Sequence, residues 1–125
     1  MADCASIFVL EDEALIRMMV VEMVEKLGHR VVVEAGSISE GLELAQTAEF
    51  DLALLDINID GDTSTDIAHI IECRGLPFLF VSGYSSTGLP PPFHESRVLQ
   101  KPFQAETLQN AIDQLLGQPN ASDDA

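Results

Sequence analysis

Basic residues are scarce in this sequence. Lysine and arginine together number 6 against 21 aspartates and glutamates, which gives a formal net charge of −15. Nucleic acids and anionic membrane lipids carry charge of the same sign, so the surface is not expected to bind either of them. Part of the excess lies in a flexible acidic tail that we expect over residues 118–125. Some of the remainder is expected to form a carboxylate cluster that needs a cation.

Cysteines and long apolar runs are scarce as well. Cys4 and Cys73 are the only cysteines and fit no metal-binding spacing, so we expect two free thiols in a reducing cytosol rather than a disulfide. No apolar run reaches the ~18 residues of a membrane span, and no basic segment precedes the first apolar run as in a signal peptide. These absences predict a cytoplasmic protein that does not contact a membrane.

What the sequence does contain is a regular alternation of apolar segments. With 125 residues, of which 46% are hydrophobic, the chain is expected to form one domain, residues 1–125, with a core over about 5–117. Strands are expected at 6–10, 30–34, 51–56, 77–82 and 97–100. Helices are expected at 13–28, from a capping box at Ser37 and Glu40 through Ala45, at 63–74 and at 104–116. The segment 84–96 contains three consecutive prolines, so any helix there is short.

The helices carry apolar residues at helical spacing. The stripe of the first helix comprises Leu15, Met19, Met23 and Leu27. The last helix is expected to bury Leu108, Ile112 and Leu115. Continuous apolar strands that alternate with helices predict an α/β fold, a parallel sheet covered on both faces. The expected architecture is a flavodoxin-like (βα)5 doubly wound sheet of five strands in the order 2-1-3-4-5.

Polar residues stand where the strands of this sheet end, which is where such sheets bind ligands. They are Glu11, Asp12, Asp56, Ser82, which is followed by Gly83, and Lys101. Each has an ordinary alternative, since Asp12 fits a helix N-cap and Asp56 fits a turn. Their convergence on one edge favours a site. Clustered carboxylates suit Mg²⁺, a lysine beside them suits phosphate, and a carboxylate is a nucleophile towards phosphorus.

The segment DINIDGD, residues 56–62, has a competing interpretation as the start of an EF-hand calcium loop. Such a loop needs a glutamate at its twelfth position, and this chain has Ile67 there. The residues before Asp56 are also typical of a strand and not of a helix. We therefore expect Asp56 to be a strand-end nucleophile, and Asp60 and Asp62 only to solvate a surface turn.

Four motifs together resemble a response-regulator receiver domain of two-component signalling. They are LEDE at 10–13, the aspartate that ends LALLD, FVSGY at 80–84 and LQKPF at 99–103. The motif at 80–84 also resembles a subgroup of stand-alone receivers with a Phe-Ala-Thr-Gly-Tyr-type motif. The resemblance implies a signalling protein, and not an enzyme that acts on outside substrates. It would accept a phosphoryl group from a histidine kinase or phosphotransfer protein, as a switch towards a downstream protein or as a phosphorelay intermediate.

The family pattern assigns a role to each matching residue. Asp56 would be the phosphoacceptor. Mg²⁺ would be held by Glu11, Asp12, Asp56 and the backbone carbonyl of Asn58. Ser82 and the amide of Gly83 would bind phosphoryl oxygens, and Lys101 would pair with the phosphate, with its bond to Pro102 cis as in relatives.

Two departures bear on how such a receiver would switch. Val98 stands where the family usually has an aromatic residue, and Asp60 stands where it often has a proline. We therefore expect Ser82, Tyr84 and Val98 to be involved in a different switch, in which phosphorylation reorders residues 83–96. The alternative to a phosphorylated receiver is an interaction module on the same fold that is regulated by binding alone. The complete set of carboxylates, hydroxyl and lysine favours the receiver.

Overall fold

A computed structural model describes residues 4–82, 98–100 and 103–116. The helices and strands in these ranges are β1 (Ser6–Leu10), α1 (Ala14–Lys26), β2 (Arg30–Ala35), α2 (Ile38–Thr47), β3 (Leu52–Asp56), β4 (Asn58–Ile59), β5 (Asp62–Thr63), α3 (Thr65–Cys73), β6 (Phe78–Ser82), β7 (Val98–Gln100) and α4 (Ala105–Leu115). The segment 84–96 and the tail 118–125 lie outside the described residues. None of the described helices has the length and apolar character to span a bilayer.

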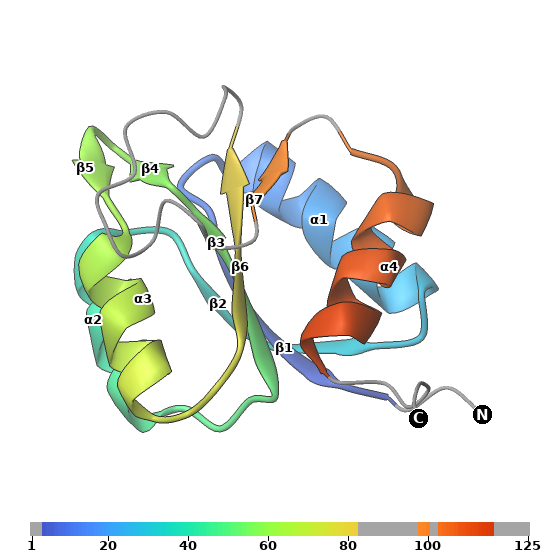
Figure 1. Ribbon diagram of the computed structural model, residues 1–125. Helices are drawn as coiled ribbons and strands as arrows, with labels where there is room; N and C mark the ends of the chain where they lie inside the picture. The colour runs from blue at the N-terminus through green and yellow to red at the C-terminus, as the bar shows by residue number, and fades with distance from the viewer. Residues whose placement is uncertain (1–3, 83–97, 101–102, 117–125) are drawn as a thin grey trace.

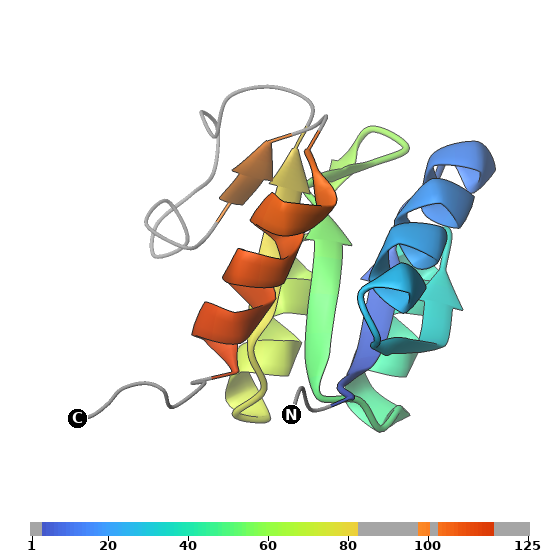
Figure 2. The ribbon, with the colours of Figure 1, turned by 90° about the vertical axis from the view of Figure 1, so that its right-hand side faces the viewer.

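The main sheet has five parallel strands in the order β2-β1-β3-β6-β7. Because β6 and β7 are the fourth and fifth strands of this sheet along the chain, the order is the predicted 2-1-3-4-5. Helices α1 and α4 cover one face of the sheet, and α2 and α3 cover the other (Figures 1 and 2). The predicted flavodoxin-like α/β fold is therefore confirmed.

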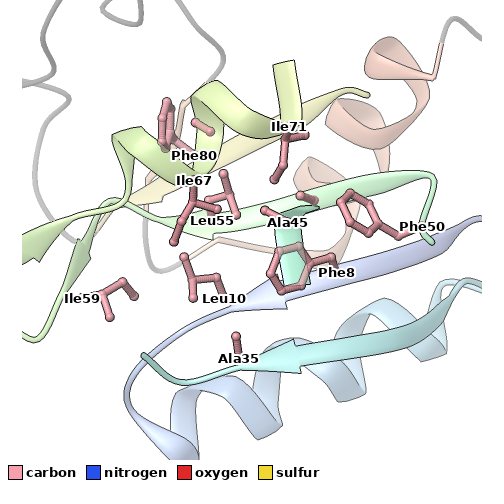
Figure 3. Packing of buried hydrophobic residues seen from close by; sticks show 12 residues of the cluster. Phe8, Leu10, Ala35, Ala45, Phe50, Leu55, Ile59, Ile67, Ile71 and Phe80 are labelled. Carbon is pink, nitrogen blue, oxygen red and sulfur yellow. The ribbon is translucent and has the colours of Figure 1, made fainter. Parts of the chain in front are cut away.

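The central strand β3 is buried along its whole length, with a hydrophobic cluster on each of its faces. Leu52 and Leu54 belong to the cluster under α1 and α4, whereas Ala53 and Leu55 belong to the cluster under α2 and α3, because successive strand side chains point to opposite faces. Figure 3 shows the second cluster. A strand enclosed in this way fixes the position of Asp56, its last residue.

Local sequence signals set three of the helix ends. Ser37 is the N-cap of α2, and its hydroxyl accepts the backbone N–H of Glu40 at 3.2 Å, as the capping box predicts. The carboxylate of Glu40 reaches back to the N–H of Gly36 at 3.0 Å. Gly28 and Gly75 follow α1 and α3 with φ of 97° and 77°, a left-handed conformation that favours glycine and ends a helix.

The face of α1 that packs on the sheet is not the apolar repeat noted in the sequence. The residues of α1 buried against the sheet are Val20 and Val24, while Met23 is only partly buried. Leu15 and Met19 belong to the apolar repeat that predicted this helix, but they are 69% and 59% exposed and do not pack on the sheet. In α4, Leu108 and Ile112 are buried as predicted, and Leu115 is partly buried.

A hairpin that was expected only as a surface turn follows β3. Strands β4 and β5 pair antiparallel, with Ile59 opposite Asp62, and are joined by Asp60 and Gly61. These two residues have φ of 54° and 92°, which matches a type I′ turn, where both central residues have positive φ. The side chain of Ile59 is fully buried in the cluster under α2 and α3, where Figure 3 labels it. The hairpin is therefore anchored to the core.

The outer strand β2 contains one residue more than its partner. Ile7 pairs with Val31 and Phe8 pairs with Val33, so Val32 has no counterpart in β1. The side chains on either side of it pack on opposite faces of the sheet, Val31 with the α1 cluster and Val33 with the α2 cluster. This geometry is a β-bulge at one edge of the sheet.

Candidate functional site

Three carboxylates meet at the carboxyl edge of the central strands. Leu10 of β1 pairs with Leu55 of β3, so the residues that follow, Glu11 and Asp56, lie side by side. Asp12 comes next in the chain. Each of the three side chains offers an oxygen, and these oxygens lie within 4.8 Å of one another. The structure thus brings together the three carboxylates that the sequence placed at strand ends.

Glu11 is held at both its backbone and its side chain. Its N–H donates to the carbonyl of Ala35 at 3.0 Å, which extends the pairing of β1 with β2 by one residue. Its carbonyl accepts a hydrogen bond from Nη1 of the Arg17 guanidinium at 2.6 Å, and its Oε2 accepts one from the backbone N–H of Glu13 at 3.1 Å. Glu11 is only 4% exposed, so the surrounding packing restricts the movement of its side chain.

Arg17 connects this site to the neighbouring strand. Besides the Glu11 carbonyl, its guanidinium contacts the Glu34 carboxylate of β2, with Nε 3.4 Å from Oε1. Gly36 leaves room for it, because a Cβ there would lie 2.8 Å from Nη1 of Arg17. No sequence motif marks Arg17 as a site residue, and its helical position alone indicates no role.

Asp12 is fixed by a residue far along the chain. Its Oδ2 accepts the backbone N–H of Asp60 at 2.9 Å. The N-cap of α1 is Glu13, so the alternative role of Asp12 as an N-cap residue is not seen. Asp60 was expected only to solvate a turn through its side chain, and this contact of its backbone N–H was not predicted. The side chain of Asp12 is half-buried, which leaves part of it open to solvent.

Asp56 ends β3 and is 8% exposed. The hydroxyl of Ser64 donates to its backbone carbonyl at 2.6 Å, and the N–H of Ser64 donates to the carbonyl of Ile57 at 2.9 Å. The N–H of Ile57 in turn donates to the carbonyl of Val81 at 3.1 Å. Ser64 is fully buried and was not among the predicted site residues. Its position just before α3 signals a helix cap, yet its hydroxyl binds Asp56.

The remaining predicted site residues divide into two groups. Ser82 is buried at the end of β6, one residue past Val81, which pairs with Asp56. Val98 pairs with Phe80 and packs against the cluster under α2 and α3. Asn58 begins β4. Outside the described residues lie Gly83, Tyr84, Lys101 and the bond from Lys101 to Pro102.

This arrangement is suited to a hard divalent cation. Oxygen ligands on three converging carboxylates, two of them buried, match the preference of Mg²⁺ for a few carboxylates plus water or phosphate oxygens. The fixed backbone around Glu11 and Asp56 lowers the entropy lost on binding, since the ligands need little rearrangement. Cation binding would also relieve the repulsion among the three charges.

Comparison with known proteins identifies the family. The profile of the response regulator receiver domain matches residues 7–113. The transcriptional regulatory protein PdtaR of Mycobacterium tuberculosis is 32% identical over 111 residues, which cover 86% of this chain and 54% of PdtaR. The phyllosphere-induced regulator PhyR of Methylorubrum extorquens is 32% identical over 122 residues, which cover 92% of this chain and 45% of PhyR. The chain thus spans about half the length of these curated relatives.

Solved structures agree with this result. The solution structure of SdrG from Sphingomonas melonis Fr1 superimposes with a TM-score of 0.80 at 32% identity, and the match covers 93% of this chain and 99% of SdrG. The two structures therefore correspond over nearly all of both chains. From the profile match, the curated relatives and this superposition, we conclude that the chain belongs to the response regulator receiver domain family.

Proposed function

We propose that this chain is a phosphoacceptor that takes a phosphoryl group on Asp56 from a histidine kinase or a phosphotransfer protein. One observation carries the proposal. In a member of the receiver family, Asp56 ends a wholly buried strand, and its carboxylate meets those of Glu11 and Asp12 within 4.8 Å. The role is that of a signalling receiver, and the only reaction it needs is phosphorylation and dephosphorylation of its own side chain.

The proposed transfer is a single displacement at phosphorus. An oxygen of the Asp56 carboxylate attacks the phosphorus of a phosphohistidine, so an O–P bond forms and the N–P bond breaks. The electron pair of the broken bond stays on the imidazole nitrogen. Such transfers depend on positioning and on charge stabilisation more than on acid–base groups. The buried backbone around Asp56 provides the positioning, because Ser64 and the pairing with Val81 restrain it on both sides.

Glu11, Asp12 and Asp56 fit Mg²⁺ as protein ligands, with the Asn58 carbonyl as a further predicted ligand. Bound there, the cation would neutralise charge on the carboxylates and on the incoming phosphoryl oxygens. Ser82 is proposed to donate its hydroxyl to a phosphoryl oxygen from the end of β6. The same role for the Gly83 amide and the ion pair of Lys101 with the phosphate stay predictions, as does the subgroup with the Phe-Ala-Thr-Gly-Tyr-type motif.

The exposed apolar side chains of α1 support a protein partner beside this site. Leu15, Met18 and Met19 are between 59% and 69% exposed, in the first half of a helix that begins two residues after Asp12. A surface hollow of about 250 Å³ lies beside Met18, and its lining consists of Ala14, Arg17, Met18, Val21 and Glu34. Large exposed apolar side chains grouped on one face are typical of protein–protein contacts. A phosphodonor protein that docks here would reach the carboxylate edge.

The test is the intact mass of the protein after incubation with acetyl phosphate. With Mg²⁺ present, the wild type should gain the mass of one phosphoryl group, and with EDTA it should gain none. Asp56→Asn should gain none in either buffer. Asp62→Asn is the matched control, because it removes the same charge from the exposed strand β5 and should be labelled like the wild type. Labelling of Asp56→Asn at the wild-type rate would refute the assignment, and a chain that is never labelled would favour regulation by binding alone.

A further inference from the structure

The contact between Asp12 and Asp60 joins the carboxylate site to the hairpin β4–β5. The two residues are 48 positions apart in the sequence, and the donor is a backbone N–H, which any residue except proline can supply. Figure 2 shows the hairpin extending beyond the end of β3. The hairpin thus supplies a fixed donor to a proposed metal ligand.

The turn geometry makes this N–H available. In a two-residue type I′ hairpin the residues that flank the loop pair with each other, as Ile59 and Asp62 do here, and the N–H of the first loop residue points away from the ladder. That residue is Asp60, with φ of 54°. Proline, which the family often has at this position, lacks the N–H and is confined to φ near −65°. This chain therefore makes a contact that a proline there excludes.

The hairpin is held on both sides of its tip. Ile59 is fully buried among core residues that include Leu10, Leu55 and Ile67. Past the tip, Ser64 binds the carbonyls of Asp56 and Ile57. The N–H of Asp60 is consequently fixed relative to Asp56, so the hydrogen bond to Oδ2 of Asp12 fixes one carboxylate relative to another.

We propose that Asp60 is a positioning residue, whose backbone N–H orients the Asp12 carboxylate for cation binding. The inference rests on the proposed function, since it assigns Asp60 a part in the same Mg²⁺ site. The N–H also offsets part of the charge on Asp12, which lowers the repulsion from Glu11 and Asp56. The side chain of Asp60 has no part in this role. Occupation of the site and the conformation of the hairpin are thereby coupled.

The test compares Asp60→Gly with Asp60→Pro by calorimetric titration with Mg²⁺. Glycine keeps the N–H and accepts positive φ, whereas proline lacks the N–H and cannot adopt positive φ. Asp60→Gly should bind Mg²⁺ within about twofold of the wild type. Asp60→Pro should lose about 10- to 100-fold in affinity, the usual effect of losing a hydrogen bond that orients a metal ligand. Equal affinity of Asp60→Pro and wild type overturns the inference, and so does an equal loss in both variants, which would assign the effect to the carboxylate.

A second measurement covers the case in which Asp60→Pro does not fold. In metal-free wild type, amide hydrogen exchange by NMR should show the N–H of Asp60 protected, and Asp12→Ala should remove that protection while leaving the N–H of Ser64 protected. Unchanged protection of Asp60 in Asp12→Ala overturns the contact. A wild type that shows this protection but binds no Mg²⁺ overturns the proposed metal site, and with it the positioning role. A wild type that binds Mg²⁺ without protection of Asp60 overturns the positioning role alone.

Discussion

Removal of the Asp56 charge should make the metal-free protein more stable. Asp56 is nearly buried, and its carboxylate lies within 4.8 Å of two others. At that separation two unit charges repel by about 3.5 kcal/mol when the effective dielectric constant is about 20, and Asp56 takes part in two such pairs. The N–H groups bound to Glu11 and Asp12 and a further interaction of Asp56 offset part of this energy, and solvent screens the half-buried Asp12. We expect Asp56→Asn to raise the free energy of unfolding by about 1 to 3 kcal/mol.

The assay is urea denaturation followed by circular dichroism, in EDTA and again in Mg²⁺. Asp62→Asn is the control, since it makes the same change in net charge at an exposed position of β5 and should shift stability by less than about 0.5 kcal/mol. Mg²⁺ at about 100 times its dissociation constant should stabilise the wild type by about 2.7 kcal/mol and Asp56→Asn by less. The advantage of the variant should therefore shrink or reverse when the cation is present.

Two results would refute this reasoning. If Asp56→Asn is no more stable than Asp62→Asn in EDTA, the three carboxylates do not repel one another to a measurable extent. If Mg²⁺ stabilises Asp56→Asn as much as the wild type, then Asp56 is not a ligand.

Three further predictions concern packing, partner docking and the backbone of the site. Gly41→Ala should lower the free energy of unfolding by about 1 kcal/mol, because its Cβ would lie 2.6 Å from Cδ1 of Ile67. Ile67→Val removes that Cδ1 atom, so it should destabilise the Gly41→Ala protein less than it destabilises the wild type. Additive effects of the two substitutions in urea denaturation would contradict the overlap. Met18→Asp should slow phosphorylation by a phosphotransfer protein about tenfold without changing the rate with acetyl phosphate, and time courses with both donors test this. Gly36→Ala should displace Arg17 from the Glu11 carbonyl and weaken Mg²⁺ binding several-fold by calorimetry; unchanged affinity would mean that Arg17 does not position the site.

The sheet and its order were predictable because the strands are enclosed by helices. A strand buried on both faces, as β3 is, must be apolar throughout, and LALLD has that pattern. The edge where Glu11, Asp12 and Asp56 meet then follows from the parallel topology, since all strands end on the same side. These inferences needed no contact between particular side chains.

The face of α1 was not predictable from periodicity. Apolar residues occur on most sides of this helix, so the line through Leu15 and Met19 fits the helical repeat as well as the line through Val20 and Val24. The difference is made by the sheet, which covers only the second line. In a sequence, exposed apolar side chains at helical spacing cannot be distinguished from buried ones.

The hairpin and its contacts were missed for another reason. Asp60-Gly61 is a strong hairpin signal, but the strands on either side have only two residues each, which is too short for an alternating pattern. The hydrogen bonds from Asp60 to Asp12 and from Ser64 to Asp56 join residues that only the folded chain brings together. No local pattern contains that information.

The bulge in β2 bears on how the sheet ends. An outer strand has a row of backbone N–H and C=O groups that can pair with another chain and so begin aggregation. In β2 the extra residue Val32 breaks the even spacing of that row, and the exposed charged residues Arg30 and Glu34 stand two positions before and after it. A second molecule that approached this edge would find neither a regular ladder nor an uncharged surface. Although Val32 is 44% exposed and lies in an apolar stretch, the strand is thus protected against extension of the sheet from one molecule to the next.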